Sequence, residues 1–258
     1  MAQTIAVLSQ KGGTGKTTTV RTLTDVLRRI DVRTLAVDLD PQGNLSDYFD
    51  LPPDSEPTIA DVLSGAAEVS AAIHQDTIPA SLNLAETELM LGGRIGREMT
   101  LRRALAGVQS EYEIVLVDCP PSLGLLTVNA LVAADYALVT AEAQYFALQG
   151  VEQAMEVIEI ARDSLNDELS LLGVLLNLAD MRTVHSREAK ASLKERFGEK
   201  VFDTTVRGSI AYAESAEQAV SILDHRPDLG ADYVALSDEL LGRLPGMADA
   251  RRRLARLR

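Results

Sequence analysis

The residues that most clearly indicate chemistry occupy positions 11–18, where the sequence reads KGGTGKTT. Glycines leave backbone N–H groups free to wrap a phosphate, and a lysine with a hydroxyl residue at the start of a helix adds positive charge and a metal ligand. We therefore expect Lys16 to reach the β- and γ-phosphates of ATP, Thr17 to bind Mg²⁺ and Thr18 to contact the α-phosphate. The loop residues expected to contact the nucleotide are Gly12, Gly13, Thr14, Gly15, Lys16, Thr17 and Thr18.

Such a loop must be held between a strand and a helix, and the rest of the chain supplies both. Short aliphatic and β-branched runs alternate with longer segments of helical periodicity, which predicts an α/β fold: a mostly parallel, twisted sheet with helices on both faces. The predicted strands are Thr4–Ser9, Arg33–Asp38, Ile114–Asp118, Tyr136–Ala141 and Leu171–Leu176. The predicted helices are Lys16–Arg29, Leu123–Ala133, Leu148–Asp163 and His185–Phe197, and LPPDSEP at 51–57 is predicted to be a surface loop.

The loop departs from the standard pattern GxxxxGK[ST], because Gln10 stands where the first glycine is expected and Lys11 follows it. In this respect it is similar to the deviant Walker A loop of the ParA/MinD/nitrogenase-iron-protein superfamily of P-loop NTPases. In that family the extra lysine, here Lys11, crosses a dimer interface to the partner's nucleotide and stabilises charge that develops during phosphoryl transfer. The resemblance implies a homodimer with ATP sandwiched between the subunits, in which Lys11 has a catalytic role.

Two further segments resemble the same family and supply carboxylates. The segment DLDPQGNLS at 38–46 resembles the switch I segment, which implies that Asp40 positions the attacking water and that Asp38 lies nearer the metal. A carboxylate beside the γ-phosphate can orient water and accept its proton, although an aspartate before Pro41 can also cap a turn. The segment IVLVDCPPSLG at 114–124 resembles a Walker B strand, which implies that Asp118 binds Mg²⁺ through water.

Two segments narrow the resemblance to the ParA/Soj group of partition ATPases: the motif DCPPSLG and the segment AEAQYFALQGVEQ at 141–153. This resemblance covers residues 4–244. A single cysteine, Cys119, excludes the nitrogenase iron protein, which needs two cysteines per subunit for its cluster. The resemblance implies a slow ATPase that a ParB-like partner stimulates. In its ATP state it binds nonspecific DNA and positions or segregates a DNA or protein cargo. We expect one P-loop ATPase domain over residues 1–247.

The surfaces for the base and for DNA are less clearly marked. The resemblance places Asn177, in GVLLNLAD, against the adenine, although an asparagine that closes a strand is often a turn residue. The stretch TVRGSIAYAESA at 205–216 departs most from the family pattern, since only one of its two usual arginines is present. The candidate DNA contacts are therefore Arg182, Lys190, Lys194 and Arg207. Acidic neighbours such as Glu188 and Glu195 leave open a solvated helix with no DNA role.

The last segment, 248–258, is predicted to be an arginine-rich C-terminal tail, with five arginines in its final ten residues. It could be a solvated extension, a DNA-binding arm or a membrane-surface helix such as the one that ends MinD. The third possibility belongs to an alternative function, a MinD-like membrane-associated ATPase that positions a division or appendage machine. Leu254 and Leu257 are the only large apolar residues after Met247, and a membrane helix needs a broader apolar face.

Composition sets outer limits on these hypotheses. The 258 residues are 46% hydrophobic and 24% charged, which suits a soluble α/β protein with one large core. We see neither an apolar run of about 20 residues nor a signal peptide, so we expect no membrane span and a cytoplasmic, nucleoid-associated protein. The net charge of −13 argues against a uniformly basic nucleic-acid binder, so any DNA contact must come from a local patch.

Overall fold

The sheet is the element that positions every predicted site residue. The computed structural model describes residues 2–52, 54–144 and 146–257, and within them seven strands form one sheet in the order β3-β2-β4-β1-β5-β6-β7. All neighbouring strands pair in parallel, which confirms the predicted fold class. The strands are β1 (Gln3–Leu8), β2 (Thr34–Asp38), β3 (Thr77–Ile78), β4 (Ile114–Asp118), β5 (Tyr136–Glu142), β6 (Ser170–Ala179) and β7 (Val201–Arg207).

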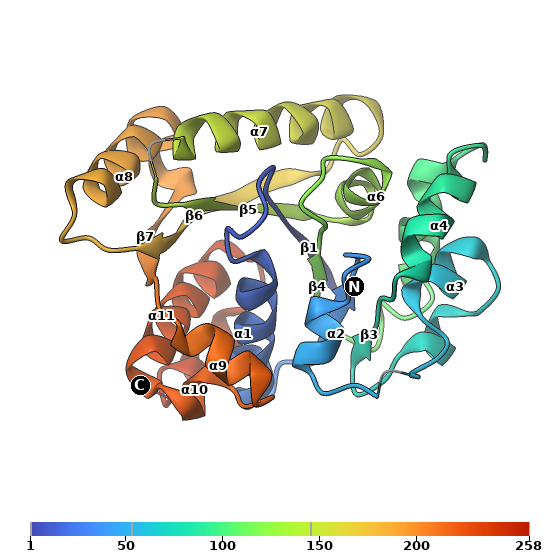
Figure 1. Cartoon of the computed structure of the whole chain (residues 1–258), viewed down its shortest axis with the longest axis horizontal. Helices are drawn as coiled ribbons and strands as arrows, with labels where there is room; N and C mark the ends of the chain where they lie inside the picture. Colours follow the sequence, from blue (N-terminus) through green and yellow to red (C-terminus); the bar gives the residue numbers. More distant parts are fainter. Residues whose placement is uncertain (1, 53, 145, 258) are drawn as a thin grey trace.

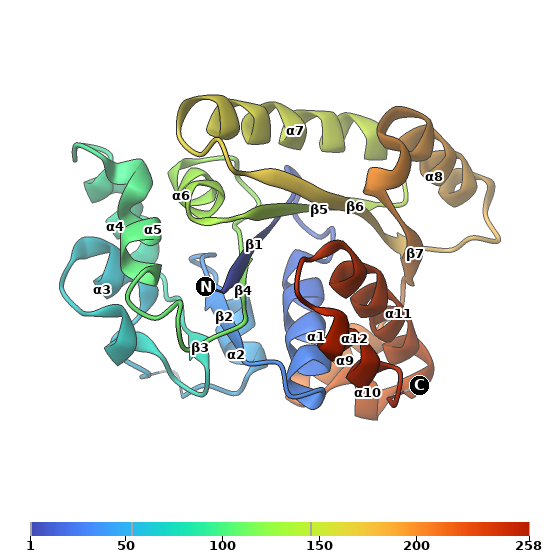
Figure 2. The same ribbon diagram turned by 180° about the vertical axis from the view of Figure 1, so that it is seen from behind.

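Helices cover both faces of this sheet, as Figures 1 and 2 show. The helices are α1 (Lys16–Arg29), α2 (Asn44–Tyr48), α3 (Ile59–Ser64), α4 (Asn83–Leu91), α5 (Thr100–Leu105), α6 (Leu125–Ala133), α7 (Ala147–Ser164), α8 (Val184–Phe197), α9 (Ala211–Glu217), α10 (Ile222–His225), α11 (Pro227–Arg243) and α12 (Ala248–Leu254). Helices α1 and α9 to α12 lie on one face, and α6, α7 and α8 lie on the other (Figures 1 and 2). Three short 3₁₀ turns span Val69–Ala72, Arg97–Met99 and Gly198–Lys200.

Side chains of one strand alternate between the two halves of the core. In β1, Ile5 and Val7 pack with α1 and α11, whereas Ala6 and Leu8 pack with the helices of the opposite face. This two-residue period is the geometry of a strand buried on both faces. Because all strands run in parallel, their carboxyl ends lie along one edge of the sheet, and the loops that follow β1, β2 and β4 meet there.

The predicted strands and helices correspond to β1, β2, β4, β5 and β6 and to α1, α6, α7 and α8. The main difference is that β6 continues to Ala179, three residues beyond its predicted end. Two strands were not predicted. The strand β3 has only two residues, and β7 is an edge strand whose Asp203 is exposed, so neither shows a clear apolar run.

The predicted C-terminal tail folds onto the domain over its described part. Leu254 is fully buried and Ala250 nearly so, in the same core cluster as α1 and α11. Arg251 donates two hydrogen bonds of 2.8 and 3.0 Å to the carboxylate of Asp238, and Arg253 donates to the Ile30 carbonyl at the end of α1. The apolar residues of α12 are therefore used inside the protein rather than offered to a membrane.

Four residues lie outside the described part: Met1, Pro53 of the loop 51–57, Tyr145 of the segment 141–153, and Arg258 of the C-terminal tail. In the described residues, no helix is both long and apolar enough to cross a bilayer.

Candidate active site

The segment KGGTGKTT forms the loop between β1 and α1, at the carboxyl edge of the sheet. Gly13 and Gly15 have φ angles of 77° and 80°, in the left-handed region that glycine adopts most easily. Gly15 immediately precedes α1, so the free N–H groups of the first helical turn face the loop. The geometry is that of an anion site at a helix N-terminus.

Buried hydroxyl groups hold the loop against the sheet. Ser9 Oγ donates to the Lys11 carbonyl at 2.8 Å and also lies 2.8 Å from the Thr14 hydroxyl. Because Ser9 has one proton to give, Thr14 must donate to Ser9, and Thr140 on β5 must in turn donate to Thr14 across 2.9 Å. The loop is thus tied to both β1 and β5.

Two carboxylates meet at the carboxyl ends of neighbouring strands, because Asp38 on β2 is in register with Asp118 on β4. Both side chains are fully buried. Asp38 accepts hydrogen bonds from the backbone N–H of Asp40 at 3.1 Å and from the N–H and hydroxyl of Ser46 at 3.0 and 2.8 Å. It therefore fixes the segment that follows β2.

The Asp118 carboxylate has fewer hydrogen-bond donors around it than Asp38 has. Neither oxygen accepts a well-formed hydrogen bond within the described residues, although the Thr17 hydroxyl is close enough to favour its charged form. Burial, and then repulsion from Asp38, raises the pKa of Asp118 well above its ordinary value. Burial also raises the pKa of Asp38, to about 6. A buried carboxylate without donors is a site that a cation would stabilise.

These contacts distinguish the two predicted metal ligands. Asp38 and Asp118 were both assigned to Mg²⁺, and Asp38 already accepts three hydrogen bonds, from Asp40 and Ser46, which leaves less of its lone-pair capacity for a metal. The structure favours Asp118, with Thr17 beside it, as the protein side of a magnesium site. No group of three or more His, Cys, Asp or Glu side chains in the described residues is placed to hold a metal by itself. This suits Mg²⁺, which commonly takes one or two carboxylates plus phosphate oxygens and water.

An open pocket of about 690 Å³ joins the loop to the segment after β2 and to α9. Its volume is in the range of small-molecule sites. Asp40, only 8% exposed, lines it opposite the loop. The lining residues are Gly12, Gly13, Gly15, Lys16, Thr17, Thr18, Asp40, Gln42, Asn44, Asp47, Tyr48, Pro121, Leu178, Ser209, Tyr212, Ala213, Ala216 and Glu217.

One wall of this pocket was not predicted from the sequence. Tyr212, Ala213 and Ala216 come from α9, far from the loop along the chain, and their segment 205–216 was noted only as a departure from the family. The tyrosine was the one available signal, because an aromatic ring in a polar segment at the end of a strand can flank a base.

Asn177 is not placed for the adenine contact that was predicted. It is 1% exposed, and its side-chain N–H groups donate to the Thr14 carbonyl at 2.9 Å and to the Thr19 hydroxyl at 3.1 Å. The physical reason is that β6 continues beyond Asn177, so its side chain points behind the loop instead of closing a turn. The next residue, Leu178, lines the pocket and has a φ of 54°, which is unusual for a bulky residue.

Comparison with known proteins agrees with this geometry. The AAA domain family matches residues 2–171. The chain is 36% identical over 249 residues to the sporulation initiation inhibitor protein Soj of Bacillus subtilis, covering 93% of this chain and 98% of that protein. It is 37% identical over 250 residues to the chromosome partitioning protein ParA of Caulobacter vibrioides, covering 93% and 94%. The chain belongs to the ParA/MinD-type ATPases of this AAA domain family.

A solved structure supports the assignment of cofactors in this ParA/MinD-type chain. The Mycobacterium smegmatis protein described as cobyrinic acid a,c-diamide synthase, with bound ADP and magnesium, is 38% identical. It covers 84% of this chain and 93% of its own, with a TM-score of 0.77. ATP and Mg²⁺ are accordingly the cofactors, and the residues around the pocket fit them: N–H groups at the start of α1 for phosphate, and the buried Asp118 with Thr17 beside it for the metal.

The two lysines of the ParA/MinD-type loop face different surroundings. Lys16 is 7% exposed, lines the pocket and donates to Ser9 Oγ at 3.2 Å. Its burial lowers the pKa of its ammonium, an effect that Asp118 opposes. The Lys11 side chain is 64% exposed and does not line that pocket; its ammonium lies 3.2 Å from Glu142 and 3.3 Å from Gln144.

Two of the predicted DNA contacts, Arg182 and Arg207, each form a bidentate salt bridge with an aspartate. Arg182 donates two hydrogen bonds of 2.9 Å to Asp180, and its side chain remains 91% exposed. Arg207, on β7, donates to Asp232 at 2.9 and 3.1 Å. Each arginine therefore carries a neighbouring negative charge that reduces its attraction for a phosphate backbone.

The other two predicted contacts, Lys190 and Lys194 on α8, converge on one residue of β7. Lys190 donates to the Asp203 carbonyl at 2.7 Å, and Lys194 is paired with the Asp203 carboxylate. By contrast, among the described residues Arg187, near the start of α8, donates only to the backbone carbonyls of Met181 and Arg182, at 3.3 and 2.8 Å. Arg187 was not predicted as a DNA contact, because the sequence does not reveal which arginines pair with a carboxylate in the fold.

Proposed function

We propose that the protein is a dimerising ATPase whose ATP-bound homodimer binds DNA without sequence preference and positions or segregates a DNA or protein cargo. The observation that carries the proposal is the division between the two lysines of one loop. Lys16 lies inside the nucleotide pocket, whereas Lys11 is exposed beside it, where a second subunit could approach. The relatives named for chromosome partitioning, which match nearly the full chain, also support a role in positioning a DNA cargo.

In the proposed reaction, each charged residue has a separate task. Lys16 binds the β- and γ-phosphates, and Thr17 and Asp118 hold Mg²⁺. Asp40 orients the attacking water, while Lys11 of each subunit reaches the nucleotide of the other and stabilises the transferring phosphoryl group. Turnover is slow until a ParB-like partner stimulates it, which gives the ATP dimer a useful lifetime on DNA.

The catalytic assignment is tested by steady-state ATP hydrolysis of purified protein. We expect Lys16→Ala to lose nucleotide binding and Asp40→Ala to bind ATP while turning it over about 100-fold more slowly. Asp47→Ala is the matched control, because Asp47 also lines the pocket but holds neither the loop nor water in this scheme. Wild-type turnover in Asp40→Ala would remove Asp40 from the reaction.

The DNA surface is proposed to centre on Arg182 and Arg187, with Arg207 and the α8 lysines in support. The Arg182→Ala/Arg187→Ala double variant should bind nonspecific duplex DNA about tenfold more weakly, with a shallower salt dependence. The control is Arg33→Ala, since Arg33 is also exposed but precedes β2 at the opposite edge of the sheet. Binding that occurs equally with ADP and ATP, or that is insensitive to salt, would contradict the proposal.

The same preparations distinguish DNA binding from the membrane alternative. Sedimentation with anionic liposomes and ATP should leave the protein in the supernatant, because Leu254 of α12 is buried in the core. Pelleting that disappears on deletion of residues 249–258 would favour the MinD-like function. We propose a cytoplasmic, nucleoid-associated protein in accordance with the DNA-binding function.

A further inference from the structure

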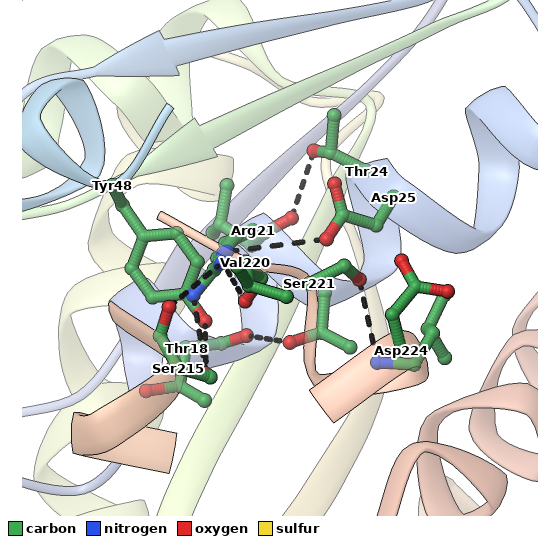
Figure 3. A network of polar contacts seen from close by, with 12 residues as sticks. Thr18, Arg21, Thr24, Asp25, Tyr48, Ser215, Val220, Ser221 and Asp224 are labelled. Carbon is green, nitrogen blue, oxygen red and sulfur yellow. Dashed lines mark hydrogen bonds and ion pairs between the residues drawn. The ribbon is translucent and has the colours of Figure 1, made fainter. Parts of the chain in front are cut away.

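A buried arginine lies directly behind the nucleotide pocket, on the helix that follows the phosphate-binding loop. Arg21 of α1 is 2% exposed. Its guanidinium donates to the Val220 carbonyl at 2.6 Å and approaches the hydroxyl and carbonyl of Ser215 at 3.5 Å. It also lies over the ring of Tyr48, and Figure 3 shows the guanidinium surrounded by these groups.

Two of the partners of Arg21, Tyr48 and Ser215, belong to the helices that form the two walls of the pocket. Tyr48, at the end of α2, lines the pocket on the side of Asp40, and Ser215 is part of α9, which forms the opposite wall. The two walls also touch one another, since the Tyr48 hydroxyl lies 3.4 Å from Ser215 Oγ, which donates to the Tyr212 carbonyl at 3.0 Å. Arg21 thus contacts both α2 and α9 at the point where these two helices meet.

The helix α2, which contains Tyr48, is linked by hydrogen bonds to Asp38 and through it to the segment of Asp40. Ser46, on the same short helix, donates both its N–H and its hydroxyl to Asp38, and Asp38 accepts the N–H of Asp40. A displacement of α2 would therefore move the segment that carries Asp40. Through Tyr48, that displacement is resisted by Arg21.

A buried guanidinium is stable only while all the groups that compensate its charge stay in place. Burial lowers the pKa of Arg21 to about 10, so the group stays charged at neutral pH. Its nearest carboxylate, Asp25, is 3.9 Å away and is itself held by Ser221. The rest of the charge is balanced by the carbonyls of Ser215 and Val220 and by the Tyr48 ring, and loss of any of these leaves a buried charge undersolvated.

We propose that Arg21 is a positioning residue that makes the two walls of the nucleotide pocket, α2 and α9, close as one unit. The proposal rests on the proposed function in that the pocket takes ATP. With Arg21 in place, nucleotide that orders α9 also orders α2, and with it Asp40. Without Arg21, α2 and α9 become ordered independently when nucleotide binds. Nucleotide then binds less tightly, and ordering of α9 no longer orders α2.

The test compares Arg21→Met with Arg28→Met. Arg28 is on the same helix, half-buried, and makes the same kinds of contact, with the Thr34 and Asp76 carbonyls and the Phe49 ring, but it contacts no part of α9. We expect Arg21→Met to raise the KM for ATP about tenfold with a smaller change in kcat, while Arg28→Met stays within about twofold of wild type. Arg21→Lys, which keeps the charge but not the planar fork, should recover part of the loss.

Amide hydrogen exchange supplies a readout that a merely stabilising residue would not move. In wild type, addition of ADP and Mg²⁺ should protect residues 44–48 and 211–220 together, and in Arg21→Met that joint protection should be lost. If Arg21→Met and Arg28→Met lower the melting temperature equally and leave KM and joint protection unchanged, the proposal is overturned. The KM comparison needs turnover, but the exchange experiment needs only binding, so an inactive wild-type ATPase would count against the proposed function while the exchange result alone decides the role of Arg21.

A second pair of variants keeps the test available if Arg21→Met does not fold. Tyr48→Phe removes the hydroxyl that faces Ser215, and Ser215→Ala removes its partner. The proposal requires that their effects on ADP affinity be non-additive, since each variant loosens the same closure. Additive effects would show that the walls bind nucleotide independently and would overturn the proposal.

Discussion

The phosphate-binding loop contains a matched pair of glycines that tests how it is held. Gly13 and Gly15 both have left-handed φ angles, 77° and 80°. A Cβ at position 13 would meet nothing within 4 Å, whereas a Cβ at position 15 would lie 2.9 Å from the side-chain nitrogen of Asn177. Alanine at either position therefore carries the same backbone strain, but only alanine at position 15 must displace Asn177.

The expected magnitudes follow from these contacts. A left-handed conformation costs an alanine about 1–2 kcal/mol relative to the right-handed one, and this applies to both variants. Displacing Asn177 forfeits its hydrogen bonds to the Thr14 carbonyl and the Thr19 hydroxyl, each contributing about 1 kcal/mol. Gly15→Ala should therefore lower the free energy of unfolding by about 2 kcal/mol more than Gly13→Ala.

Urea denaturation of the nucleotide-free protein measures this difference. In an Asn177→Ala background, the additional cost of Gly15→Ala should fall to that of Gly13→Ala, because the group that would be displaced is gone. Equal costs of the two alanines in the wild-type background would refute the reasoning, and so would an unchanged gap between them in the Asn177→Ala background. Either result would mean that Asn177 does not hold the loop.

Two further predictions concern stability away from the loop. Asp118→Asn should raise the free energy of unfolding of the metal-free protein at pH 7, because it removes a buried negative charge that Asp38 repels. The raised pKa of Asp118 means that the folded state favours the protonated acid, so its stability is retained at low pH and lost as the pH rises. The gain in Asp118→Asn should therefore shrink towards pH 4 in denaturation series, and a gain that is larger at pH 4 would contradict this sign. Leu254→Ala should cost about 3 kcal/mol because Leu254 is fully buried, whereas Leu257→Ala, at a residue 46% exposed, should cost less than about 0.5 kcal/mol. Similar melting temperatures for the two leucine variants would mean that α12 is not docked in solution.

The sequence marked the loop and the two aspartates that end the buried strands β2 and β4. Asp38 and Asp118 are each marked by the apolar run that precedes them, and the structure places them side by side because parallel strands end along one edge. The loop itself could be predicted because its glycines, lysine and threonines are contiguous. These are local patterns, and the fold brings them together in a regular way.

Features that depend on side-chain direction could not be predicted in this way. Asn177 was expected at a strand end, but β6 continues past it and turns its amide towards the loop. Tyr212 reaches the pocket only through the packing of α9 against α2, where Tyr48 meets a residue 167 positions further along the chain. Arg207 carries the expected charge, yet its pairing with Asp232 depends on the position of α11.

The central claim, that one loop serves its own nucleotide through Lys16 and a partner subunit through Lys11, has a direct test. Light scattering coupled to size-exclusion chromatography should show Asp40→Ala with ATP and Mg²⁺ at twice the monomer mass, and with ADP at the monomer mass. The Lys11→Ala/Asp40→Ala double variant should remain monomeric with ATP while still binding a fluorescent ATP analogue. A double variant that dimerises as readily as Asp40→Ala would contradict the claim, because Lys11 would then have no task in a second subunit.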